Sequence, residues 1–166
     1  MTTINPASNL PADIQKELKD AFGIVPSFAH VLPPEQFRQW WGQIRDFQLS
    51  EETALDGKTK ELIGLGVSAQ IPCHYCVMFH TEAARLNGAT EHELQEAIYM
   101  ASLTRQGSTI LNGTQINPQT FDKELAQMVS YIKSKAPKEG ASHERPSGAR
   151  RPERPSTVPA STATHR

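Results

Sequence analysis

The stretch ELIGLGVSAQIPCHYCVMFH, Glu61 to His80, contains both cysteines of this 166-residue chain. Cys73 and Cys76 stand three residues apart, and His80 follows four residues after Cys76. Apolar residues at helical spacing lie on both sides of Pro72, a residue that ends one helix but suits the first turn of the next. The stretch therefore predicts two helices that meet at Pro72, with both cysteines in the opening turn of the second helix.

The predicted geometry brings three kinds of reactive side chain together. Cys73, Cys76 and His80 share one face of the second helix, because successive residues turn by about 100°. If the helices fold back as an antiparallel pair, Glu61 lies about 16 Å from the Pro72 corner and His80 about 12 Å, at a rise of ~1.5 Å per residue. A carboxylate, an imidazole and a thiol in line can move a proton off sulfur, and a helix N-terminus favours the thiolate. We therefore expect a redox-active dithiol served by Glu61 and His80.

Other interpretations of the two cysteines stay open. Cysteines in a helix can be small buried apolar residues. Glu61, Cys73, Cys76 and His80 could instead hold zinc, although most structural zinc sites pair two separated ligand groups and this chain has one. Haem attachment would need a histidine directly after Cys76, where Val77 stands. A thioredoxin fold would place the pair after a strand, whereas the preceding segment is helical in period.

The combination of Glu61, the Cys73–Cys76 pair and His80 closely resembles the motif of the alkylhydroperoxidase D-like proteins. These proteins belong to the carboxymuconolactone decarboxylase family, and the resemblance extends over about residues 20–115. It implies an all-α fold in which an antiparallel helix pair carries the C-x-x-C motif. It also implies assembly into homotrimers or homohexamers, and peroxide reduction by the cysteine pair.

The resemblance further implies a role for each site residue. Cys76 corresponds to the buried sulfur that attacks peroxide, and Cys73 to the more exposed resolving sulfur. Glu61 and His80 correspond to the proton relay. Related enzymes can carry a second relay histidine just before the second cysteine, where this chain has Tyr75, so a part for Tyr75 or the neighbouring His74 stays open.

Composition limits the classes of partner. A net charge of −1 gives the whole chain no nucleic-acid signature. The first residues lack the basic start and apolar run of a signal peptide, and no apolar stretch approaches the roughly 18 residues that span a bilayer. We therefore expect a cytoplasmic protein without membrane or nucleic-acid partners, in which a lone C-x-x-C is more often catalytic than structural. We expect no bound cofactor and no metal.

Upstream of the dithiol stretch the sequence predicts two helices. The first begins at Pro11 and ends at Gly23. The second begins at Pro33-Pro34 and carries an apolar stripe as far as Leu49. Trp40 and Trp41 within it diverge by about 100°, so we expect one to pack against the domain's own helices and the other to lie at a subunit contact or at the peroxide entrance. The alternative is that both are buried locally, on different sides of the helix.

Cap signals mark the remaining helices. Asp56 is a suitable N-cap for the helix that contains Glu61. Thr90 and Glu93 form a capping box that begins a helix running towards Gly107, and residues 105–113 fit either a helix or a loop. Asn117-Pro118 supplies the start of a last helix.

The sequence predicts one helical domain over residues 1–136 and a disordered Pro/Arg/Ser-rich tail over 137–166. The tail has five prolines, one branched aliphatic residue and no aromatic residue, too little to order itself. Its six Lys/Arg and three Glu give it a charge of +3, which leaves −4 for the remainder.

These features together predict an antioxidant peroxidase: a hydroperoxide-reducing disulfide oxidoreductase with peroxiredoxin-type activity. The resemblance implies a lipoyl- or thioredoxin-type dithiol as reductant, with a peroxiredoxin as a further partner. One alternative is decarboxylase or lactone chemistry, which the family includes and which would make the cysteines incidental. The other is a non-catalytic thiol redox sensor.

Overall fold

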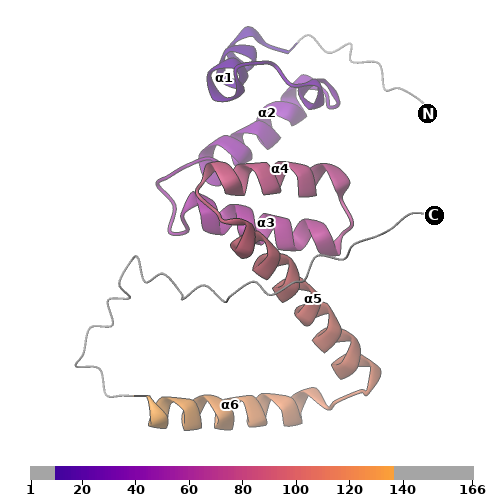
Figure 1. The fold of residues 1–166 in the computed structure, drawn as a ribbon. Coiled ribbons are helices and arrows are strands. Elements are labelled where there is room, and N and C mark those ends of the chain that lie inside the picture. The colour runs from indigo at the N-terminus through magenta and orange to yellow at the C-terminus, as the bar shows by residue number, and fades with distance from the viewer. Residues whose placement is uncertain (1–9, 137–166) are drawn as a thin grey trace, which may run out of the picture. The chain divides into compact units, whose positions relative to one another are not determined.

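The computed structural model describes residues 10–136, and every element in this part of the chain is a helix (Figure 1). In chain order the elements are α1 (Ala12–Phe22), the 3-10 helix η1 (Ser27–His30), α2 (Pro34–Gln43), the π-helix η2 (Ile44–Gln48), α3 (Gly57–Gln70), α4 (His74–Leu86), α5 (Glu91–Gly113) and α6 (Pro118–Lys135). The predicted all-α fold is confirmed. The chain divides into two compact units, Met1–Gln115 and Ile116–Arg166. The predicted tail, 137–166, lies outside the described residues, and the domain boundary before it stays a prediction.

The helices α1, η1 and α2 share an apolar core. Its buried members are Leu10, Ile14, Leu18, Ala29, Phe37 and Trp41. The four-residue spacing of Ile14 and Leu18 places both on the same face of α1. Gly23 follows α1 with φ 75°, a left-handed conformation that suits glycine, so the predicted limits of this helix are confirmed.

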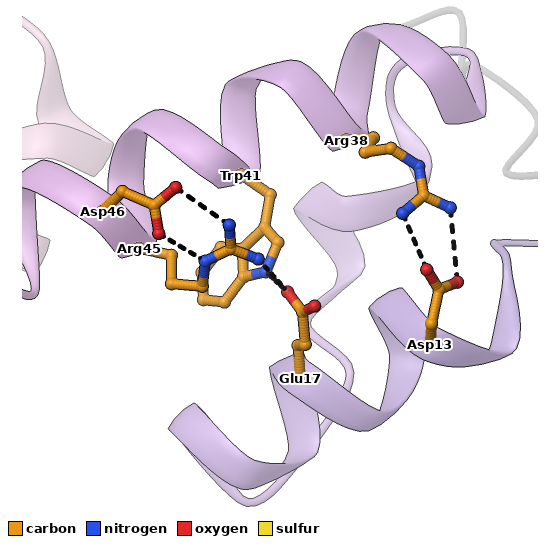
Figure 2. Close-up of polar contacts among 6 residues, drawn as sticks. All are labelled: Asp13, Glu17, Arg38, Trp41, Arg45 and Asp46. Atoms are coloured by element: carbon orange, nitrogen blue, oxygen red, sulfur yellow. Dashed lines mark hydrogen bonds and ion pairs between the residues drawn. The ribbon is translucent and has the colours of Figure 1, made fainter.

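Polar contacts join α1 to the helices that follow it (Figure 2). Arg38 of α2 pairs with Asp13 at 2.7 Å, and Arg45 of η2 pairs with Glu17 at 2.7 Å. The buried Trp41 donates its indole N–H to Glu17 at 2.7 Å, so the ring is buried without losing a hydrogen bond. The hydrogen bond from Arg38 holds the pKa of Asp13 below its ordinary value. Exposed ion pairs such as these contribute little to the stability of a fold.

The second predicted helix does not continue unchanged to Leu49. It is α-helical to Gln43 and then forms the π-helix η2, in which the N–H of Leu49 donates to the carbonyl of Ile44 at 2.9 Å. A π-helix has more residues per turn, which rotates the side chains after it relative to an α-helical continuation. No proline or glycine within η2 signals the change, so the sequence pattern missed it.

The adjacent tryptophans separate as predicted. Trp41 is 1% exposed, whereas Trp40 is 39% exposed and packs edge-on against the rings of Phe28 and Phe37. One indole therefore belongs to the core and the other lies at its margin. The predicted role of the outer one at a subunit contact or at the peroxide entrance stays a prediction.

The helices α3 and α4 form the antiparallel pair, and α5 packs against α3 (Figure 1). Leu65, Ala84 and Leu94, one from each helix, are the buried residues of this second core. Asp56 caps α3 by accepting the N–H of Thr59 at 2.7 Å, as its position predicted. The dithiol hairpin is therefore built around its own small core, with α3 in the middle.

The start of α5 follows from a local signal, whereas its end does not. Thr90 and Glu93 form the predicted capping box: the Glu93 N–H donates to Thr90 Oγ1 at 3.1 Å, and the Thr90 N–H donates to Glu93 Oε2 at 2.7 Å. The helix continues to Gly113, so the ambiguous segment 105–113 is helical. Asn117 accepts the N–H of Thr120 at 3.0 Å and begins α6, which confirms the last predicted start.

Much apolar surface of α5 and α6 is exposed in the described part of the chain. On α6 it comprises Phe121, Leu125, Met128, Val129, Tyr131 and Ile132, and on the later turns of α5 it includes Leu103, Ile110 and Leu111. Within residues 10–136, no helix is both long and apolar enough to cross a bilayer.

Candidate active site

The end of α3 and the start of α4 position the two cysteines. Cys73 is the N-cap of α4: its sulfur accepts the N–H of Cys76 at 3.3 Å, and its own N–H donates to the carbonyl of Ser68 at 3.1 Å. The two sulfurs form a disulfide between Cα atoms 5.3 Å apart. The cysteines therefore lie in the opening turn of the second helix of the pair, as predicted.

A buried carboxylate and an imidazole lie deeper in the same hairpin. Glu61 Oε2 and His80 Nδ1 are 2.6 Å apart, and Glu61 is only 2% exposed. Glu61 comes from α3 and His80 from α4, one turn beyond Cys76. The antiparallel pair thus brings Glu61 to His80, as the distances from the corner predicted.

Gly64 makes this contact sterically possible, and sequence reasoning did not single it out. It lies one turn after Glu61 on α3, and a Cβ placed on it would stand 2.5 Å from His80 Nδ1. The imidazole therefore rests where any larger residue would project. The available signal was a glycine inside a helix, which costs about 1 kcal/mol relative to alanine and so calls for a packing reason.

Gln48 is a second residue that the sequence did not reveal. Its side-chain amide, at the end of η2, donates to Glu61 Oε1 at 3.0 Å. Both oxygens of the buried carboxylate are thereby bonded, one within the hairpin and one from outside it. No motif marks Gln48, because the π-helix determines the direction of its side chain.

The remaining candidates lie at the surface. His74 and Tyr75 follow Cys73 in the first turn of α4; both are exposed, Tyr75 to 84%, and their rings are 6.1 Å apart. Cys73 and Cys76 are both partly buried, so exposure alone does not rank the two sulfurs. Among residues 10–136, no cluster of three or more His, Cys, Asp or Glu side chains has a metal-binding arrangement.

Comparison with known proteins gives this site a context. Residues 35–116 match the model of the carboxymuconolactone decarboxylase family. The structure is similar to the crystal structure of the alkylhydroperoxidase AhpD core from Rhodospirillum rubrum, with a TM-score of 0.59 and 28% identity over 66% of this chain and 83% of that one. The family model and the structural match together support assignment of the chain to the carboxymuconolactone decarboxylase family.

A further relative comes from Paracoccus denitrificans, where it is described as uncharacterized protein 4 in the cox locus. It is 40% identical over 55 residues, which are 33% of this chain and 50% of the relative. The chain therefore spans about half the length of that curated relative. The candidate site, from Gln48 to His80, lies wholly inside the part that matches the family model.

The arrangement at this site combines two chemical capacities. The sulfurs can pair with each other, because the disulfide closes within one helical turn. The Glu61–His80 pair can accept a proton where little water reaches it. The fold is thus of the AhpD type and carries the parts of a dithiol site with a proton acceptor beside it.

Proposed function

We propose that this protein is a disulfide oxidoreductase that reduces hydroperoxides with the Cys73–Cys76 dithiol. The observation that carries the proposal is the disulfide in the first turn of α4 with the buried Glu61–His80 pair one turn deeper in the same hairpin. A disulfide at a helix N-terminus favours redox use, because the free N–H groups and the helix dipole stabilise a thiolate there. The similarity to the alkylhydroperoxidase AhpD core supports the same class of reaction.

The proposed reaction begins on Cys76. His80, backed by the Glu61 carboxylate, takes the thiol proton, and the thiolate attacks one peroxide oxygen. The O–O bond breaks, Cys76 becomes a sulfenic acid, and the departing alkoxide receives the proton as an alcohol. Cys73 then attacks the sulfenic sulfur, which forms the disulfide and releases water. One peroxide has been reduced by two electrons, and the dithiol has been oxidised by two.

An external dithiol completes the cycle. Its thiolate attacks the disulfide, and a second attack releases both cysteines as thiols and leaves the reductant oxidised. We propose a lipoyl- or thioredoxin-type reductant that enters through Cys73, the N-cap of α4, and a peroxiredoxin as a further partner. We place this activity in the cytoplasm, where such reductants keep thiols reduced.

We also propose that the protein works as a homo-oligomer, a trimer or a hexamer. The exposed apolar face of α6 and the outer face of Trp40 support self-association, because surfaces of this kind are favoured at subunit contacts.

A stoichiometric oxidation experiment tests the proposed function. Reduced protein is mixed with one equivalent of an organic hydroperoxide, and free thiols, alcohol product and the Cys73–Cys76 disulfide are counted. We expect two thiols lost and one alcohol formed per chain, followed by recovery with dihydrolipoamide or reduced thioredoxin. The Cys73→Ser, Cys76→Ser double variant is the control and should form no alcohol.

The double variant, assayed also for decarboxylase and lactone chemistry, separates the alternatives. A decarboxylase or lactone-processing enzyme would keep its full activity in the double variant. A redox sensor would form the disulfide with peroxide but show negligible turnover with every dithiol, together with a reproducible change of shape. Either result would overturn the peroxidase proposal.

A further inference from the structure

The buried carboxylate of Glu61 has a partner from outside the dithiol hairpin. Gln48 Nε2 lies 3.0 Å from Glu61 Oε1, while the other oxygen, Oε2, bonds His80. An ionised carboxylate accepts hydrogen bonds and cannot donate them. The NH₂ group of the Gln48 amide is therefore the group that faces Glu61. The two bonds together set the orientation of the carboxylate relative to His80.

The structure holds Gln48 firmly in this position. Lys60, the residue before Glu61, is 8% exposed, and its ammonium donates to the carbonyls of Phe47 at 2.8 Å and Ser50 at 2.6 Å. It also donates to Thr53 Oγ1 at 2.9 Å. These bonds tie the backbone on both sides of Gln48 to α3, so the position of the amide is determined by the same helix that carries Glu61.

The π-helix η2 determines the direction of the Gln48 side chain. Gln48 is the last residue of η2, just before the bond from the Leu49 N–H to the Ile44 carbonyl. Short π-helical segments occur frequently at functional sites, where they redirect a side chain. Here the segment turns a neutral donor onto the carboxylate that backs the proton acceptor.

We propose that Gln48 is a positioning residue for the proton transfer, an inference that rests on the proposed function. Its amide holds one carboxylate oxygen of Glu61 so that the other is directed at His80, and its hydrogen bond stabilises the ionised carboxylate. The Glu61–His80 pair then stays free to accept the Cys76 proton down to a lower pH than it would without Gln48.

Apart from His80, the charged groups near Glu61 are paired elsewhere, and the second hydrogen bond to its carboxylate comes from the neutral amide of Gln48. From α4 the facing group is His80 itself. On α3 the ammonium group of the neighbouring Lys60 donates its three hydrogen bonds to the carbonyls of Phe47 and Ser50 and to the hydroxyl of Thr53. In η2 the charged residues, Arg45 and Asp46, pair with each other at 2.6 Å, and Arg45 also pairs with Glu17 of α1.

The test is the pH profile of single-turnover oxidation of Cys76, in a Cys73→Ser background, by an organic hydroperoxide. The acid limb of this profile reports protonation of the base. Gln48→Met keeps the length of the side chain but removes the donor, and we expect the limb to move to higher pH by about one unit. Gln48→Glu puts a second carboxylate beside Glu61 and should move the acid limb further to higher pH, because two carboxylates at one site hold a proton more strongly.

Controls separate positioning from mere packing. Gln43→Met makes the same change at an exposed residue of α2 and should leave the limb in place. Glu61→Gln should change the limb and slow oxidation by about 10²-fold or more at neutral pH, because His80 loses the carboxylate that backs it. A packing role alone would lower stability, or the rate at every pH, without moving the limb.

A measurement on the unmodified side chain covers the case in which the variants fold poorly. In ¹⁵N-labelled Cys73→Ser protein, with its parent Gln48, the Gln48 side-chain amide signal should shift with pH at the same midpoint as the acid limb. If that signal is insensitive to pH, or if folded Gln48→Met and Gln48→Glu keep the parent profile while Glu61→Gln changes it, the role of Gln48 is wrong and the proposed function stands. If peroxide does not oxidise the parent protein at all, the proposed function itself fails.

Discussion

At the scale of single residues, the site depends on how closely the two helices of the hairpin approach each other. His80 reaches Glu61 across the surface of α3 at Gly64, where a side chain would overlap the imidazole. The carboxylate that receives it is buried, so the Glu61–His80 bond replaces the water that both groups would otherwise bind. Small changes here should affect proton transfer well before they affect the fold.

Gly64→Ala tests this close approach. Alanine favours a helix by about 1 kcal/mol over glycine, but at this position its methyl group must displace His80. We therefore expect no gain in melting temperature and a loss of at least about tenfold in the peroxide oxidation rate, since the general base is misplaced. Rate assays and thermal melts followed by circular dichroism measure both effects.

Gly66→Ala, on the same helix, is the matched control. A Cβ there would lie 3.6 Å from the Ala97 carbonyl oxygen and 3.7 Å from the Ala101 Cβ, ordinary contact distances. This variant should keep its rate and melt at the same or a higher temperature. Equal loss of rate in both variants would mean that the space at Gly64 has no special part.

The two cysteines should differ in reactivity although both are partly buried. Cys76 precedes His80 by one helical turn, whereas Cys73 is the cap and bonds the Cys76 N–H through its sulfur. Cys73→Ser should trap a sulfenic acid on Cys76 when peroxide is added, and Cys76→Ser should leave Cys73 largely unoxidised. Labelling with a dimedone probe and peptide mass spectrometry distinguish these outcomes, and equal labelling of both variants would contradict the assignment.

At the scale of helices, α3 is held to its neighbours by polar contacts at its first turn as well as by the small core. Lys58 pairs with Glu93 of α5 at 2.8 Å, and Lys60 binds the segment that precedes α3. The Lys58 contact, followed by the bonds from Thr90, lowers the pKa of Glu93 from 4.5 to about 2. The capping box of α5 therefore also joins α5 to the dithiol hairpin.

Glu93→Gln should reduce stability in a pH-dependent way. Because the folded pKa of Glu93 lies below its ordinary value, the ionised side chain stabilises the fold above about pH 4.5, and that contribution is lost as the pH falls towards 2. The variant should melt at a lower temperature than the parent at pH 7, and the gap should narrow between pH 4.5 and 2. The gap should be small, because the carboxylate is 35% exposed.

Glu96→Gln is the control for this prediction. Its carboxylate pairs with His92 of its own helix at 3.3 Å and does not join α5 to α3. Thermal melts of both variants across the same pH range should show the narrowing gap for Glu93→Gln alone. A gap that stays constant for Glu93→Gln would remove the link between its charge and the fold.

At the scale of the whole molecule, the described helices expose more apolar surface than their own packing covers. Leu125 and Met128 of α6 are 45% and 49% exposed, and Trp40 in the other unit is 39% exposed. Large exposed apolar patches on soluble proteins commonly mark sites of association. These surfaces support the proposed homo-oligomer, and they can be tested one at a time.

Leu125→Glu should shift the solution mass towards the monomer. A charge placed in a desolvated subunit contact is unfavourable, whereas on a solvated helix face it is tolerated. Sedimentation at micromolar concentration measures the mass, and circular dichroism should show unchanged helix content. Gln127→Glu adds the same charge on roughly the opposite side of α6 and should leave the mass unchanged; if both variants keep the parent mass, this face is not a subunit contact.

What the sequence alone determined is largely local. Asp56, Thr90 and Asn117 start helices through bonds to N–H groups three residues on, and Gly23 ends one, so short-range patterns locate them. The place of the cysteines in a first helical turn follows from Pro72 in the same way. Even the Glu61–His80 contact was predictable, because a tight corner and a constant rise per residue determine which positions of an antiparallel pair meet.

Only the tertiary structure decided the features that depend on contacts between distant elements. No residue type within η2 predicts a π-helix, so the hydrogen bond from Gln48 to Glu61 could not be derived from sequence spacing. The role of Gly64 depends on which side chain crosses it, and the burial of Trp41 rather than Trp40 depends on where α1 and η1 pack. In each case local preference leaves several arrangements nearly equal in free energy, and packing against the rest of the chain selects one.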